Sequence, residues 1–434
     1  MHRAGSIARA RTSCRPAVAL GLVLIALLNG CVGPTRPPVP APTREGRWRQ
    51  DLHYMATNLK RLHKNLFFKT TEDEFDEVVQ ALDRSIDSMG DHEIIVEFMR
   101  IVALVGDDHT RLSWRANSVM RTYPLRLEWF SDGLYVIRAA EEHRRALRCR
   151  LVRIGRNDIR EVCAALRELI PHENDAAFKW FAPSYLAVPE ILHALAYVPD
   201  IERGAFVFQD TDGQEFTLEL APTLRGGSSD VSWVSAVDWE KVPKPLYLKK
   251  DTLYWFEYLE DSKTLYCQYN RCRNMRDYPF SAFAADLLKV LDAQPVERFV
   301  LDLRRNPGGN SEVIKPLRER LAKHDRISRK GRLFVLIGRK TFSSAAKNTI
   351  QLRRRTEAIF VGEPTGQKPN TFGEIKRFEL PNSKIPVSYS TKYFRMMADD
   401  PASFVPDIRV DLSSADYFAG RDPVLEAVLA HDME

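Results

Sequence analysis

The chain has 434 residues, of which 44% are hydrophobic, and this length exceeds what one small domain needs. Four of its 64 basic residues are arginines within the first 30 positions, where no acidic residue occurs, so beyond them 60 basic residues face 58 acidic ones. This near balance disfavours a nucleic-acid-binding protein. Four cysteines lie beyond residue 31 without metal-site spacing, and both disulfides and buried free thiols are compatible with them.

The N-terminus has the features of an export signal. Residues 17–28 form an apolar stretch that is too short and too terminal for a stable spanning helix. Residues 28–31 read Leu-Asn-Gly-Cys, which resembles a bacterial lipobox with Cys31 as the lipidated first residue. We therefore expect a signal peptide over 1–30, a proline-rich tether over 31–46, and a lipid-anchored protein facing the periplasm of a bacterial cell envelope, or a secreted one if the lipobox is not used.

Two regions with different patterns follow the tether. Residues 47–118 place apolar side chains at helical spacing and predict a helical region. Residues 119–225 predict short strands at 124–129, 133–137 and 149–154, a helix at 159–169, and then more helices and a hairpin around 209–213. Residues 226–252 begin with a Gly-Gly-Ser-Ser-Asp run and are predicted to be a linker.

The last region, residues 253–434, alternates strand and helix patterns and predicts an α/β sheet. Its helices are expected at 281–292, 311–323 and 344–355, and a hairpin is expected over 374–390. The chain should close with a helix that is capped by Asp422 and opened by Pro423.

Two loops of this last region have residues suited to acyl transfer. In the first, which follows an apolar strand at 298–302, Gly308 and Gly309 can turn backbone N–H groups toward an anion, while Asp302 and Arg304 can brace the loop. The second, residues 341–346, reads Thr-Phe-Ser-Ser-Ala-Ala and joins an apolar strand to a helix. A serine at the N-terminus of that helix, Ser344, can act as a nucleophile beside a stabilised oxyanion, or as a plain helix cap.

Together these loops resemble the tail-specific (carboxyl-terminal processing) serine proteases, whose core is shared with the tricorn protease and with interphotoreceptor retinoid-binding protein modules. The resemblance implies a ClpP/crotonase-like α/β protease core, preceded by a divergent PDZ-like domain and an N-terminal helical region. It implies a serine endopeptidase acting on unfolded or C-terminally exposed polypeptides without a metal or organic cofactor. Ser344 is then the nucleophile, and the N–H of Ala345 forms the oxyanion hole with Gly308 or Gly309.

The family takes its general base from one of two places, and the sequence offers both. Residues 106–110 read Gly-Asp-Asp-His-Thr, which fits the motif that supplies a histidine, here His109. Lys368 falls near the position of the alternative lysine. We favour His109, because histidine titrates near neutrality whereas Lys368 lies in a polar turn that offers little desolvation.

The sequence does not single out the group that orients this base. The expected acidic partner of His109 is Asp399 or Asp400, ahead of Asp107, Asp108 and Glu374. The family often has a glutamate three residues after the nucleophile, where this chain has Lys347. A non-catalytic binding protein on the same fold and an esterase or transacylase using the same serine remain as alternatives.

Overall fold

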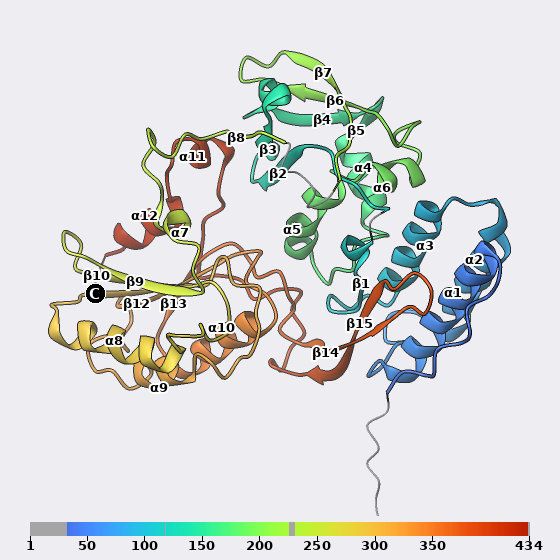
Figure 1. Ribbon diagram of the computed structural model, residues 1–434. Helices are drawn as coiled ribbons and strands as arrows, with labels where there is room; N and C mark the ends of the chain where they lie inside the picture. Colours follow the sequence, from blue (N-terminus) through green and yellow to red (C-terminus); the bar gives the residue numbers. More distant parts are fainter. Residues whose placement is uncertain (1–32, 118, 225–230, 433–434) are drawn as a thin grey trace, which may run out of the picture. The chain divides into compact units, whose positions relative to one another are not determined.

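The computed structural model describes residues 33–117, 119–224 and 231–432 (Figure 1). The predicted signal peptide, Cys31 and residues 226–230 of the predicted linker lie outside the described residues. None of the described helices is both long and apolar enough to cross a membrane.

The predicted N-terminal helical region contains three helices, and the first of them begins at Arg44, within the predicted tether. They are α1 (Arg44–Leu62), α2 (Glu72–Ser85) and α3 (Asp91–Leu104), with a short 3-10 turn η1 (Ile86–Ser88) before α3. The start of α2 is fixed by a capping box in which the Thr71 hydroxyl accepts from the Glu74 N–H and the Glu74 carboxylate accepts from the Thr71 N–H. The buried faces of α1 and α3 share one hydrophobic core.

The second region forms a seven-stranded sheet, and the strands and helix predicted over 124–169 are all present. The main strand order is β2-β3-β4-β6-β7, with β5 on β4 and β8 on β3, so β2 is an edge strand. The described cysteines are free and buried. The elements are β2 (Leu125–Phe130), β3 (Gly133–Ala140), η3 (Glu141–Ala146), β4 (Arg150–Ile154), β5 (Asn157–Asp158), α4 (Ile159–Leu166), α5 (Asp175–Tyr185), α6 (Pro189–Ala194), β6 (Gly204–Gln209), β7 (Glu215–Leu220) and β8 (Trp233–Ser235).

The last region is the predicted α/β layer structure around a six-stranded sheet of order β16-β13-β12-β11-β10-β9. All neighbours are parallel except β9 and β10. Helices α8, α9 and α10 cover one face and α12 covers the other (Figure 1). The bounds are α7 (Leu246–Lys249), β9 (Tyr254–Leu259), β10 (Thr264–Tyr269), α8 (Phe280–Ala293), β11 (Arg298–Asp302), α9 (Lys315–Leu321), β12 (Leu333–Ile337), α10 (Ser344–Arg355), β13 (Ile359–Gly362), β16 (Ile408–Arg409), α11 (Ser414–Phe418) and α12 (Pro423–Leu429).

A third, small sheet joins the end of the helical region to the last region of the chain. The predicted hairpin is formed by β14 (Thr371–Glu379) and β15 (Pro386–Phe394), and β15 also pairs with β1 (Arg111–Leu112), which precedes the turn η2 (Trp114–Ala116). The register sets Arg111 opposite Ser388. Because β1 directly follows the Gly-Asp-Asp-His-Thr segment, this pairing carries His109 to the α/β core.

Candidate active site

Two loops that leave the carboxyl ends of neighbouring parallel strands meet at the candidate site. The loop after β12 is tied to the loop after β11, since the Thr341 hydroxyl donates to the Leu303 carbonyl at 2.8 Å and the Phe342 N–H donates to the Asn306 carbonyl at 3.0 Å. The crevice at the carboxyl ends of such strands is the usual ligand site of α/β sheets. Asp302 and Arg304 brace the first loop as expected, and Arg304 also reaches Asp422.

The second loop ends at Ser343, which is the serine that meets the histidine. Its Oγ lies 3.1 Å from Nε2 of His109. Its backbone has φ 53° and ψ −123°, a conformation that costs a non-glycine residue about 1–3 kcal/mol and occurs preferentially at functional sites. A serine held on a strained strand-to-helix turn presents its hydroxyl in the manner of a nucleophile elbow.

The expected nucleophile, Ser344, occupies a different position. It is the first residue of α10 and is buried, and its hydroxyl donates to the Gly309 carbonyl at 2.6 Å. The backbone turn at Ser343 directs the two neighbouring side chains to different partners. Ser344 therefore links the two loops, and the serine hydroxyl that faces His109 belongs to Ser343, one residue before the expected nucleophile.

The shift by one residue also changes the expected oxyanion hole. The Ala345 N–H donates to the Phe342 carbonyl at 3.0 Å, and the Gly308 N–H donates to Asn306 Oδ1 at 2.9 Å, so both are engaged. Within the described ranges, no acceptor is found for the N–H groups of Ser344 and Gly309. These two amides, one from each loop, are therefore the candidate donors to an oxyanion at Ser343.

Only glycines fit the first loop at this point. A Cβ on Gly308 would come within 2.6 Å of the Ser343 Cβ, and one on Gly309 within 2.2 Å of the Cys272 carbonyl oxygen. Both glycines also have positive φ, of 100° and 140°. The positive φ expected of both glycines is confirmed.

His109 is held in a neutral state beside Ser343. The backbone N–H of His109 donates to Asp107 Oδ1 at 2.9 Å, and its ring lies against the Phe342 ring with centroids 4.9 Å apart. Burial lowers the pKa of its imidazole to about 4, although the Asp107 carboxylate opposes this shift, and Arg111 and Lys347 add to it. An imidazole without its second proton is the form that can accept one from a serine hydroxyl.

An amide, not a carboxylate, faces the other nitrogen of this imidazole. Gln367 Nε2 lies 3.3 Å from His109 Nδ1 and 3.0 Å from Thr371 Oγ1, whose hydroxyl donates to Glu173 Oε2 at 3.0 Å. Gln367 Oε1 is buried without a hydrogen-bond partner among the described residues. The backbone of Phe372 opposes the lowering of the pKa of this imidazole.

Asp107 acts as a structural carboxylate beneath the site. It accepts from the Thr110 hydroxyl at 2.6 Å and lies 3.2 Å from Nε2 of His63. Burial opposes its ionisation, but the hydrogen bond from His63 and the neighbouring His109 outweigh burial and hold its pKa well below the usual range. Its Oδ1 is 3.9 Å from His109 Nδ1, beyond hydrogen-bond distance.

Asp108 and Glu173 form a buried carboxyl pair next to this network. The Glu173 N–H donates to Asp108 Oδ1 at 3.0 Å. Burial raises the pKa of Asp108 to about 7, and burial together with Asp108 raises the pKa of Glu173 well above its usual range. Both carboxyl groups therefore ionise less readily than ordinary carboxyl groups do.

The alternative base and the expected acidic partners lie elsewhere. Lys368 Nζ donates to Asp400 Oδ2 at 2.7 Å, so these two form an ion pair with each other. The Asp399 carbonyl accepts from the Asn370 side chain. Glu374 is exposed and faces Lys392. None of these four expected residues contacts Ser343 or His109, since neither appears among their hydrogen bonds or ion pairs in the described chain.

Lys347 lies on the first turn of α10, three residues after Ser344 and four residues after Ser343. Its Nζ is 3.0 Å from the centroid of the Phe394 ring. Burial lowers its pKa to about 8, and Lys392 adds to this shift while Glu374 opposes it. Its positive charge in turn lowers the pKa of His109.

Sequence reasoning missed Ser343, Gln367, Thr371 and Glu173 as members of the site. The sequence did indicate Ser343 as a candidate, because residues 343 and 344 are both serines. At a strand-to-helix turn only one of two neighbouring hydroxyls faces the strand ends. Gln367 directly precedes Lys368, which the sequence offered as the alternative base. For Glu173 and Thr371 no local pattern was available.

Comparisons with known proteins indicate a peptidase family and a peptidase fold. Residues 274–395 match the model of peptidase family S41. Mature CPAF complexed with lactacystin has the same fold at a TM-score of 0.63 and 13% identity, over 89% of this chain and 98% of that one. A second structure of mature CPAF gives a TM-score of 0.60 at 14% identity, over 89% of this chain and 96% of that one. No curated protein sequence matches.

The family match covers the loop with Gly308 and Gly309, the turn at Ser343, and the segment with Gln367. It confirms the resemblance to the tail-specific proteases and the α/β protease fold. Residues 274–395 are therefore similar to peptidase family S41, and the chain is a serine-type peptidase.

Proposed function

We propose that this peptidase hydrolyses peptide bonds with Ser343 as nucleophile and His109 as general base. The contact of 3.1 Å between Ser343 Oγ and His109 Nε2, made from a strained turn, carries this proposal. Oγ attacks the carbonyl carbon while its proton passes to Nε2, and the oxyanion takes hydrogen bonds from the N–H groups of Ser344 and Gly309. The imidazolium then protonates the leaving amine. Water hydrolyses the acyl-enzyme through the same imidazole and restores Ser343.

Gln367 is proposed as the positioning residue for this base. For Nε2 to accept a proton, Nδ1 must carry the other one, and that N–H needs an acceptor. A half-turn of the Gln367 amide places its unpartnered oxygen at Nδ1. With Glu173 protonated, its O–H donates to Thr371 Oγ1, and the Thr371 hydroxyl donates to the Gln367 oxygen. The raised pKa of Glu173 favours this direction of hydrogen bonding.

Replacing Gln367 tests this arrangement. Gln367→Ala removes the acceptor of Nδ1 and should lower kcat about 10- to 100-fold with little change in KM, as expected for a lost hydrogen bond of about 1.5–3 kcal/mol to a group that becomes charged. Gln367→Glu should keep more activity and move the acidic limb of the pH–rate profile upward, because a carboxylate favours the imidazolium. Equal losses in both variants with unchanged pH profiles would assign Gln367 a purely structural role.

The proposed substrate is an unfolded or loosely held polypeptide. One cleft runs along edge strand β2, and its lining includes Leu125, Leu127, Trp180, Trp233 and Lys340. Trp180 also contacts Phe342, whose ring covers His109. An extended peptide could add to β2 as a further strand, in the way that PDZ domains bind their ligands, and continue toward Ser343.

Labelling of the active serine tests the function directly. A fluorophosphonate probe should modify the wild-type chain, and mass spectrometry of the digest should find the adduct on Ser343. Turnover of an unfolded polypeptide should then exceed that of a small ester. A chain that takes no label would be a non-catalytic binding protein, and a chain that prefers the ester would be an esterase or transacylase.

Export and lipid anchoring through Cys31 are also proposed, on the signal pattern and lipobox-like segment of the sequence. Cys31→Ser should release the protein from the membrane fraction with its peptidase activity intact. Membrane retention of this variant would refute the anchor.

A further inference from the structure

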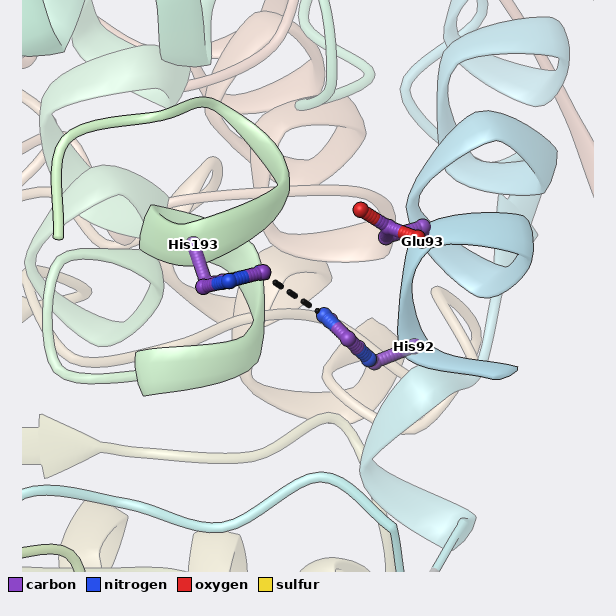
Figure 2. A group of neighbouring side chains, drawn as sticks. All are labelled: His92, Glu93 and His193. Carbon is purple, nitrogen blue, oxygen red and sulfur yellow. Dashed lines mark hydrogen bonds between the residues drawn. The ribbon is translucent and has the colours of Figure 1, made fainter. Parts of the chain in front are cut away.

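Two histidines from distant parts of the chain face each other between α3 and α6. His92 is the second residue of α3 and His193 lies in α6. Nε2 of His92 is 3.0 Å from Nδ1 of His193, and both side chains are half-buried (Figure 2). One proton at most can lie between these two nitrogens, so at least one of them presents a lone pair.

A carboxylate completes the group. Glu93 follows His92, and its ligand oxygen and the two imidazole nitrogens all lie within 4.8 Å of one another. Its Oε2 accepts from the Gly90 N–H at 2.6 Å, which fixes the side chain against the start of α3. Figure 2 shows the three side chains reaching into the space between the two helices. Imidazole nitrogens and a carboxylate oxygen are a donor set that Zn²⁺ binds.

The spacing of these atoms suits one small cation. Ligands at about 2.0–2.1 Å in a tetrahedral Zn²⁺ site are separated from each other by about 3.3–3.4 Å. The two nitrogens would have to move apart by a few tenths of an ångström, and the carboxylate would have to turn inward. Rotation of partly buried side chains is sufficient for both.

The other acidic groups nearby are already engaged. Asp91 accepts from Arg44 and from the Trp48 indole, and Glu190 accepts from the backbone and side chain of Arg121. They add negative potential around the three-residue group without serving as ligands. The ligand set is therefore limited to His92, Glu93 and His193, with the remaining position left for water.

We propose that His92, Glu93 and His193 bind a divalent transition-metal ion, with Zn²⁺ as the best match. The ion would hold the N-terminal end of α3 to α6. The opposite end of α3 leads into the segment that carries His109, so the site braces the helix that delivers the histidine. It takes no part in the hydrolysis, for which the sequence implies no metal, and it does not depend on the proposed function.

Metal binding by the full chain tests this proposal. After treatment with a chelator and its removal, Zn²⁺ should bind with one equivalent in calorimetry and raise Tm. Co²⁺ should give the visible absorption bands of a nitrogen- and oxygen-ligated ion. His193→Ala and His92→Ala should each weaken binding at least tenfold and abolish the rise in Tm. Glu93→Gln, which keeps the capping group, should weaken it less.

A matched control separates this site from other histidines. His53→Ala changes an exposed histidine on α1 that faces Asp83 and should bind Zn²⁺ as the wild type does. If His193→Ala does not fold, the wild-type calorimetry and Co²⁺ spectrum still decide the matter. No binding by the wild type, or equal binding by the wild type and both histidine variants, overturns the proposal.

Discussion

Ser343→Ala should reduce peptide hydrolysis to background, whereas Ser344→Ala should keep most of it. Removal of a serine nucleophile that works with a histidine base typically lowers kcat by about 10⁶-fold, because residual catalysis then comes only from the oxyanion donors and from binding. Ser343→Ala should also fold well, since it removes one hydroxyl at a partly exposed turn. Steady-state turnover of an unfolded polypeptide measures the loss.

The neighbouring variant is the matched control. Ser344→Ala removes the hydrogen bond to the Gly309 carbonyl, a net loss of about 0.5–1.5 kcal/mol of stability. The backbone N–H of residue 344 remains, so the proposed oxyanion donor is kept. Thermal unfolding should show the larger change for Ser344→Ala and kinetics the larger change for Ser343→Ala. The reverse order of the two kinetic losses would restore Ser344 as the nucleophile.

The sequence could locate the catalytic turn but could not distinguish its two serines. The apolar run of β12 and the helix-forming run of α10 place the turn correctly. Which hydroxyl faces the strand ends depends on the backbone dihedral angles of Ser343, and a serine gives no local signal for positive φ as a glycine would. The sequence therefore predicts the turn, and the choice between Ser343 and Ser344 rests on the backbone geometry and on the kinetic test above.

The same contrast holds for the fold and for the rest of the site. The α/β core was predictable because its strands are continuous apolar segments that alternate with helix-forming segments, and because Asp422 caps α12. Only the hairpin β14–β15 of the small sheet was predictable, because its two strands are joined by a local turn. The pairing of β15 with β1 brings together Arg111 and Ser388, which lie far apart in the sequence. Glu173 and Gln367 reach His109 through such long-range contacts, which have no sequence period.

His109→Ala should lower turnover nearly as far as Ser343→Ala, and the double variant should be little worse than either. Residues that act as one unit lose activity non-additively, because neither works without the other. Lys368→Ala should lower turnover little, since Lys368 forms an ion pair with the exposed side chain of Asp400. A large loss in Lys368→Ala together with retained activity in His109→Ala would instead support a serine–lysine pair.

The pH dependence gives an independent test of the same base. Because burial lowers the pKa of His109 to about 4 from the ordinary 6.5, the imidazole stays neutral well below neutral pH. The acidic limb of kcat/KM, which reports the free enzyme, should therefore lie near pH 4 and not near 6.5. The folded state binds this proton more weakly than the unfolded state does, so the contribution to stability is complete above about pH 6.5 and is lost as the pH falls toward 4.

Lys347→Met removes a positive charge that lowers the pKa of His109, and it should move the acidic limb of kcat/KM to higher pH. A limb that stays in place in Lys347→Met, or one that lies at alkaline pH in the wild type, would exclude His109 as the titrating base.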